Sequence, residues 1–170
     1  DYGYADKVST LTETEKTSYA SFNASTDKSS RTAMIYVGAN DGMLHGFYSY
    51  MDGTEEKLEE KYAVVPSAVY PKLNLLTSTD YAHEYYVDGS PVVGDAYINS
   101  SWKTVLLGST GAGGKSVFAL DITDPDDFDA GNLMWEFDTT NTTYANDMGY
   151  SIPHPSIVRL HNGKFVALIA

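Results

Sequence analysis

A glycine-rich stretch that ends in lysine and serine is the first place where this sequence could carry chemistry. Residues 108–116 read Gly-Ser-Thr-Gly-Ala-Gly-Gly-Lys-Ser. A phosphate-binding loop needs a glycine separated by four residues from its Gly-Lys-Ser/Thr end, and a helix behind it whose amides point at the phosphate. Here Ser109 stands where that glycine belongs, and strand-type residues follow at 117–120. We therefore interpret 108–116 as the turn of a β-hairpin and not as a nucleotide site.

An acidic segment supplies a candidate metal site. Five aspartates fall within nine residues, and calcium prefers clustered oxygen ligands. The alternating acids of an EF-hand, its glycine at the sixth position and its glutamate at the twelfth are absent. This departure favours a solvated Asp-Pro turn, with a calcium site as the alternative. The candidate ligands are Asp121, Asp124, Asp126, Asp127 and Asp129.

Other catalytic patterns are missing from the sequence. Its histidines (His45, His83, His154 and His161) do not have the spacing of a metal site such as H-E-x-x-H, and no Gly-x-Ser-x-Gly elbow occurs. The absence of cysteine excludes thiol catalysis and cysteine-based zinc or iron–sulfur sites. We expect no catalytic residue and no cofactor in this segment. The His45 ring is predicted to be packed or hydrogen-bonded beside Phe47.

Charge and hydropathy restrict the partners. The 170 residues contain 23 acidic and 11 basic side chains, which gives a net charge of -12. A nucleic-acid-binding protein needs a basic face, so this class is disfavoured. No apolar run approaches the roughly 20 residues that a membrane-spanning helix needs. The lack of cysteine is more typical of an exported bacterial protein than of a cytosolic enzyme.

Short strand-type runs separated by turn signals predict an all-β fold. Residues 1–30 are a polar lead-in, with a single helical turn at 9–16. A short helix broken by Pro71 is expected within 67–76. The predicted strands cover 33–37, 43–48, 61–65, 84–87, 90–97, 103–107, 116–120, 133–137, 155–160 and 164–170.

An internal repeat determines the predicted architecture. Gly38 and Gly108 both end a strand and lie 70 residues apart, and Pro91 and Pro155 both begin one and lie 64 apart. The repeating unit has four antiparallel strands, as in a β-propeller blade. A two-layer β-sandwich is the alternative. We expect about two and a half blades of one propeller domain spanning 31–170: a blade at 31–65, an insertion between blades at 66–83, a blade at 84–138 and a half blade at 152–170.

Several stretches, in a conserved order, resemble the propeller domain of the PilC/PilY family of type IV pilus tip-associated proteins. The stretches are 31–47 (Arg-Thr-Ala-Met-Ile-Tyr-Val-Gly-Ala-Asn-Asp-Gly-Met-Leu-His-Gly-Phe), 62–71, 81–83, 87–95, 111–125, 133–137 and 155–160. The residues that carry the signature are Gly38, Asn40, Asp41, Gly42, His45, Asp88, Gly89, Pro91, Gly113, Gly114, Asp121 and Pro155.

The resemblance implies a non-enzymatic, exported protein at the bacterial cell surface, pilus tip or outer membrane. Its implied roles are pilus assembly, control of retraction and adhesion. Its implied partners are pilins or minor pilins, a host or abiotic surface receptor, and the remaining propeller blades. Calcium is implied only elsewhere in the full-length protein, because the Asp121–Asp129 cluster departs from the family's calcium loop.

A second interpretation is a fragment of a quinoprotein-type dehydrogenase. The blades of such enzymes carry a glycine-rich hairpin, an Ala-Leu-Asp strand and a tryptophan, which Ala119-Leu120-Asp121 and Trp135 match. This enzyme would bind pyrroloquinoline quinone and calcium in its central channel. The fold prediction, a partial quinoprotein-like β-propeller, is the same for both interpretations.

Overall fold

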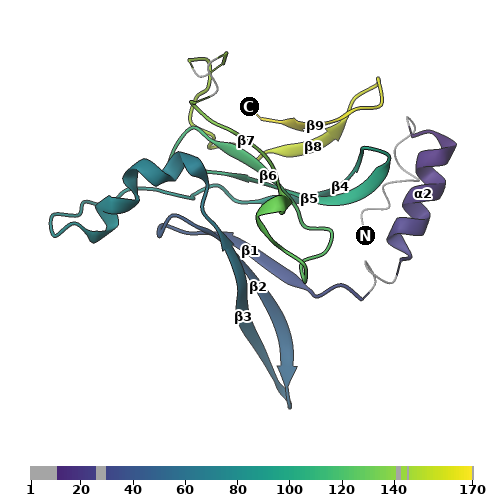
Figure 1. Cartoon of the computed structure of the whole chain (residues 1–170), viewed down its shortest axis with the longest axis horizontal. Coiled ribbons are helices and arrows are strands. Elements are labelled where there is room, and N and C mark those ends of the chain that lie inside the picture. The colour runs from purple at the N-terminus through teal and green to yellow at the C-terminus, as the bar shows by residue number, and fades with distance from the viewer. Residues whose placement is uncertain (1–10, 26–29, 141–142, 145, 170) are drawn as a thin grey trace.

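The computed structural model describes residues 11–25, 30–140, 143–144 and 146–169, and it confirms a mostly β chain (Figure 1). The helical elements are α2 (Glu13–Asn23), the 3-10 helix η1 (Ser67–Thr77) and the 3-10 helix η2 (Ala130–Asn132). The strands are β1 (Met34–Gly38), β2 (Leu44–Asp52), β3 (Glu55–Val64), β4 (Val92–Ile98), β5 (Ser101–Ser109), β6 (Val117–Asp121), β7 (Leu133–Phe137), β8 (Ser156–Arg159) and β9 (Phe165–Leu168).

The strands of the described residues form three antiparallel sheets, each made of strands that are consecutive in the sequence. The orders are β1-β2-β3, β4-β5-β6-β7 and β8-β9. The second sheet is the four-stranded blade that the repeat predicts, and its order matches the sequence order. The first sheet contains three strands and the third contains two, as the two-and-a-half-blade prediction requires.

The central sheet is buried on both faces, because a neighbouring sheet packs on each side. Leu106, Phe118 and Leu120 point to one face and pack in a cluster with Leu44 of β2. Val105, Leu107 and Ala119 point to the other face and pack with Ile157 of β8 and Phe165 of β9. Since successive side chains of a strand alternate between faces, this arrangement explains why β5 and β6 are buried at nearly every position.

The N-terminal segment differs from its prediction. The helix is α2, with 11 residues, and not a single turn at 9–16. Thr12 and Glu15 form a reciprocal capping box that fixes its start. Leu11 and Tyr19 are buried in a cluster with Trp102 of β5, so this part of the lead-in packs on the second blade. The remainder of the predicted lead-in, 1–10 and 26–29, lies outside the described residues.

Three further local predictions were wrong. Residues 84–87 form no strand, because the amides of Tyr86 and Val87 bond to the β1–β2 turn and not to a neighbouring strand. The β3 strand begins at Glu55 rather than at Lys61, since cross-strand pairing with β2 continues to the end of the hairpin. Pro71 lies inside η1 without ending it. Proline removes a helical amide bond, which is consistent with successive 3-10 turns in place of an α-helix.

The described helices include none that is both long and apolar enough to cross a bilayer.

Candidate functional site

The segment Tyr85–Gly89 runs between the first and second sheets and is the centre of the family-signature residues. The backbone N–H of Val87 donates to the carbonyl of Ala39 at 3.3 Å, and that of Tyr86 donates to Asn40 Oδ1 at 3.3 Å. On the other side, the N–H of Asp88 donates to the carbonyl of Thr110 at 3.2 Å. The segment therefore joins the β1–β2 turn to the glycine-rich β5–β6 turn.

Signature glycines line this segment because no side chain fits beside it. A Cβ atom on Gly113 would lie 1.9 Å from the carbonyl oxygen of Tyr86, and one on Gly38 would lie 2.4 Å from that of Val87. A Cβ atom on Gly89 would lie 2.0 Å from Ser109 Oγ. These distances are far below van der Waals contact, so the close approach of backbones requires glycine at these positions. We refer to Gly38, Tyr85–Gly89 and Thr110–Gly114 as the blade junction.

Lys72 of η1 holds the blade junction from outside, and the sequence analysis missed it. Its Nζ atom donates to the carbonyl oxygens of Tyr85 and Gly113, each at 2.5 Å. The ammonium also lies 4.7 Å from the ring centroid of Tyr86, whose hydroxyl donates to the Lys72 carbonyl at 3.1 Å. Burial lowers the pKa of Lys72 below its ordinary value. A single lysine within a predicted helix carries no signal for this role.

His45 is hydrogen-bonded on both sides, as predicted. Its Nε2 atom lies 2.9 Å from Asp41 Oδ2 and its Nδ1 atom lies 2.6 Å from Glu60 Oε1, while the ring stacks on Phe47 at 5.8 Å. The hydrogen bond to Glu60 is the main cause that raises the pKa of His45, with a further contribution from Asp41 and opposition from burial. The two carboxylates favour the imidazolium form.

The remaining signature residues serve turns and strand starts. Gly42 adopts a φ of +98° in the β1–β2 turn, and Asp41 accepts a hydrogen bond from the Met43 N–H there. Pro91 and Pro155 immediately precede β4 and β8, where a missing N–H is tolerated. The carbonyl of Gly114 accepts a hydrogen bond from the Ser151 N–H.

The acidic segment is structured by its own local bonds and does not bring its carboxylates to one point. Asp121 pairs with Lys103 and accepts from Thr123, whereas Asp126 pairs with Lys61 and accepts from Thr32. The carboxylates of Asp124 and Asp129 accept from backbone amides of the segment itself, and Asp127 is exposed. Among the described residues, no three acidic or histidine side chains are grouped as a metal would require.

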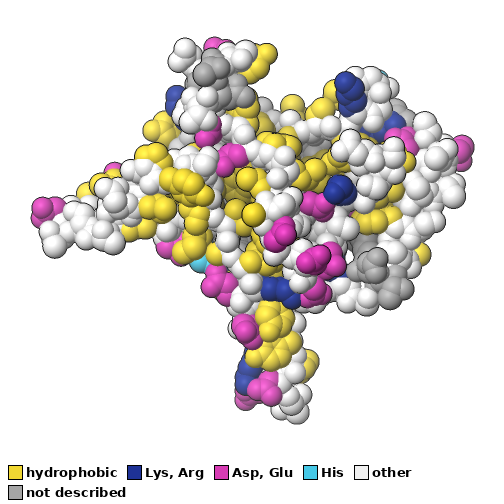
Figure 2. Space-filling model, in the orientation of Figure 1, with side chains coloured by type: hydrophobic (Ala, Val, Ile, Leu, Met, Phe, Trp, Pro, Cys, Tyr) yellow, Lys and Arg dark blue, Asp and Glu magenta, His cyan; other side chains and the backbone are white. Residues whose placement is uncertain are grey.

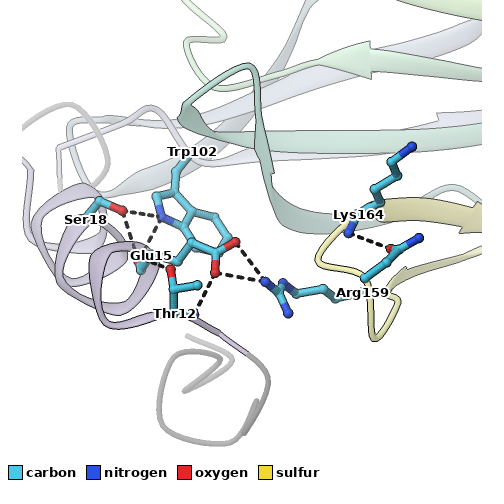
Figure 3. Close-up of polar contacts among 7 residues, drawn as sticks. Thr12, Glu15, Ser18, Trp102, Arg159 and Lys164 are labelled. Carbon is cyan, nitrogen blue, oxygen red and sulfur yellow. Dashed lines mark hydrogen bonds and ion pairs between the residues drawn. The ribbon is translucent and has the colours of Figure 1, made fainter.

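A second polar cluster connects α2 to β5 of the second sheet and to β8 of the third sheet (Figure 3). The Trp102 indole N–H of β5 donates to the Glu15 carbonyl at 3.2 Å and to Ser18 Oγ at 3.1 Å. Arg159 of β8 donates to both carboxylate oxygens of Glu15, at 2.8 and 3.0 Å. We call Thr12, Glu15, Ser18, Trp102 and Arg159 the helix clamp. Its one sequence signal was the spacing of Thr12 and Glu15, which is typical of a capping box.

The helix clamp continues into a buried carboxylate. The Tyr19 hydroxyl donates to Asp95 Oδ2 at 2.9 Å, and the Thr104 hydroxyl donates to Asp95 Oδ1 at 2.8 Å. The Tyr19 ring also meets the Trp102 ring edge-on at 4.5 Å. In both the clamp and the blade junction, polar groups connect separate segments of backbone, so the arrangement is suited to a rigid scaffold.

Comparison with known proteins agrees with this geometry. Residues 2–170 match the family described as the PilY1 beta-propeller domain. The chain is 42% identical over 168 residues to a type IV pilus biogenesis factor PilY1 homolog of Xylella fastidiosa, covering 99% of this chain. It is 50% identical over 141 residues to the type IV pilus biogenesis factor PilY1 of Pseudomonas aeruginosa PAO1, covering 81% of this chain.

The match extends to a solved structure. The crystal structure of the Pseudomonas aeruginosa PilY1 C-terminal domain is similar with a TM-score of 0.65 and 44% identity, over 89% of this chain and 26% of that chain. The chain spans about 11% of the length of the curated relatives it matches. On these grounds, the chain belongs to the PilY1 beta-propeller domain family.

Proposed function

We propose that this chain is a scaffold segment of a type IV pilus biogenesis factor, which supports pilus assembly, retraction control and surface adhesion without catalysing a reaction. The observation that carries the proposal is the agreement between the family match and the position of the signature residues in the structure. The family covers residues 2–170, and five of the twelve signature residues lie at the blade junction between the first two sheets: Gly38, Asp88, Gly89, Gly113 and Gly114.

The proposed partners are the remaining propeller blades, pilins or minor pilins, and a host or abiotic surface receptor. Exposed apolar side chains support the remaining propeller blades as partners. Ile35 and Val37 of β1 are 51% and 45% exposed on the face of the first sheet that points away from β4–β7. A further blade would bury them, in the same way that its two neighbours bury the central sheet. The proposed location is the bacterial surface at the pilus tip.

Genetic complementation tests the proposed function. In a strain that lacks the full polypeptide, the parent gene should restore surface pili, twitching and adhesion. A gene from which 31–169 is deleted should restore none of these, even when the deleted protein is exported in equal amount. Normal pili and twitching from an exported deletion protein would overturn the proposal.

The quinoprotein interpretation predicts a different result. Purified full-length protein, given pyrroloquinoline quinone and calcium, would then oxidise an alcohol with reduction of a dye. We propose that no cofactor acts in this segment, so dye reduction should not exceed that of a heat-denatured sample. Calcium- and quinone-dependent turnover would reverse the choice between the two functions.

A further inference from the structure

The longest strand of the described residues, β3, has an unpaired outer edge. It pairs with β2 alone, at the end of the order β1-β2-β3. Pairing between β1 and β2 stops at Met34 and Tyr48, so the rest of β2 and the first four residues of β3, Glu55–Leu58, form a two-stranded ribbon. The ribbon projects away from the body of the molecule (Figure 1). Exposed edge amides and carbonyls are a template for adding another strand.

An apolar groove begins where β3 returns to the body. Its volume is about 430 Å³, and its walls come from the end of β3, from η1 and from the segment that leads into β7. Tyr62 stacks on Phe128 with ring centroids 3.8 Å apart, and Tyr70 and Leu133 are 59% and 44% exposed at the rim. Figure 2 shows hydrophobic side chains gathered at this place, and both charged and hydrophobic side chains along the ribbon.

The charge of β3 indicates what could cover its edge. The strand carries Glu55, Glu56, Glu59 and Glu60 against two lysines. Both lysines are already engaged, Lys57 with Asp52 and Lys61 with Asp126. Among the described residues, no lysine or arginine forms an ion pair with the four glutamates. Glu60 is paired with His45, so among the described residues three glutamates without an ion-pair partner, Glu55, Glu56 and Glu59, lie along the free edge next to an apolar groove.

We infer that β3 and the adjoining groove bind an extended, basic segment of a partner protein as an added strand. Backbone hydrogen bonds to the β3 edge would supply the pairing, alternate lysine or arginine side chains would face the glutamates, and an apolar residue would enter the groove. The inference goes beyond the proposed pilus role and does not depend on it, because binding can be measured on the purified protein.

Labelled synthetic peptides of ten residues test the inference on the full polypeptide. One peptide alternates lysine and valine, a second has the same composition in two blocks, and a third alternates glutamate and valine. The alternating basic peptide should bind at least about tenfold tighter than either of the others. It should also slow hydrogen exchange at alternate amides of β3. Equal binding of the alternating and block peptides, or unchanged exchange in β3, would overturn the inference.

Matched variants separate an edge site from general attraction to an acidic protein. Glu59→Lys should weaken the binding of the alternating basic peptide roughly fivefold at low salt, and the effect should be smaller at about 0.5 M salt. Asp80→Lys makes the same change in charge on an exposed site outside β3 and should leave binding unchanged. Tyr70→Ser should weaken peptide binding through the groove, whereas Tyr150→Ser, at a tyrosine with a similar exposed fraction of 58%, should not. Equal losses of peptide affinity from Glu59→Lys and Asp80→Lys would contradict a binding site at the β3 edge.

Discussion

Arg159 donates from one guanidinium nitrogen to both carboxylate oxygens of Glu15, at 2.8 and 3.0 Å, across 144 residues of sequence. Both side chains are shielded, with 4% of Arg159 and 11% of Glu15 exposed. The pair connects α2 to β8, and the neighbouring Trp102 connects α2 to β5. The helix therefore ties the second blade to the half blade that follows it.

The helix clamp should contribute measurably to stability. Glu15→Gln keeps the size of the side chain but removes its charge, and it should lower the free energy of unfolding by about 1–3 kcal/mol because a shielded arginine loses its partner. Chemical denaturation of the full polypeptide, followed by tryptophan fluorescence, measures the change. Glu13→Gln is the control: Glu13 pairs with Lys16 in solvent, and its loss should cost less than about 0.5 kcal/mol. Equal effects of the two changes would contradict the clamp.

Stability should fall in acid through Glu15. Burial alone would raise the pKa of Glu15, but hydrogen bonds from Thr12 and Arg159 outweigh it and hold the pKa below the ordinary value of 4.5. A carboxylate with a lowered folded-state pKa stabilises the protein above its ordinary pKa, and this contribution is lost as the pH falls through the folded value. Denaturation between about pH 6 and pH 3 should show this loss, and Glu15→Gln should make the curve flatter. An unchanged pH dependence in the variant would show that Glu15 is not responsible.

His45 should titrate above its ordinary pKa of 6.5, because Glu60 and Asp41 stabilise the imidazolium. A raised pKa means that the stabilisation is complete below pH 6.5 and is lost as the pH rises through the folded value. Titration of the ring followed by NMR measures the value directly. Glu60→Gln should lower the pKa of His45 and reduce the loss of stability at rising pH. A His45 pKa that is the same in both proteins would contradict the assigned cause.

Lys72 should be needed for a well-formed blade junction. Lys72→Met keeps the aliphatic stem but removes both hydrogen bonds to Tyr85 and Gly113, and it should cost roughly 2 kcal/mol. Amide exchange should accelerate in 85–89 and 110–114 more than in α2. Lys16→Met, at a lysine whose ion pair is solvent-exposed, should change neither quantity. Exchange that accelerates equally in α2 would indicate a general loss of stability instead.

The blade arrangement was predictable because it depends on local and repeated signals. Turn residues, strand-type runs and the recurrence of Gly38 at Gly108 depend only on neighbouring residues or on the repeat. A packed or hydrogen-bonded His45 ring was also predictable, since His45 lies in the same predicted strand as Phe47. The resemblance to the pilus family supplied the set of signature glycines and prolines, and their importance stays a prediction.

The blade junction and the helix clamp were not predictable, because each joins residues that are far apart in the sequence. Residues 84–87 have the composition of a strand, yet the amides of Tyr86 and Val87 bond to the β1–β2 turn and that of Asp88 bonds to the β5–β6 turn. Nothing near Lys72 indicates that it reaches Tyr85 and Gly113. The calcium alternative depended on the clustering of aspartates alone, whereas in the structure Lys103, Lys61 and local amides bind most of these carboxylates.

The central claim is that the signature glycines act by allowing blades to pack, and Gly113→Ala tests it most directly. A Cβ atom there would overlap the Tyr86 carbonyl, so the variant should lose about 3 kcal/mol or more of unfolding free energy. It should lose surface pili to a matching degree. Gly149→Ala, where a Cβ atom meets nothing within 4 Å, should keep both the unfolding free energy and the surface pili. A Gly113→Ala protein with parental stability that nevertheless makes no pili would contradict the account, because the glycine-rich turn would then act directly on a partner.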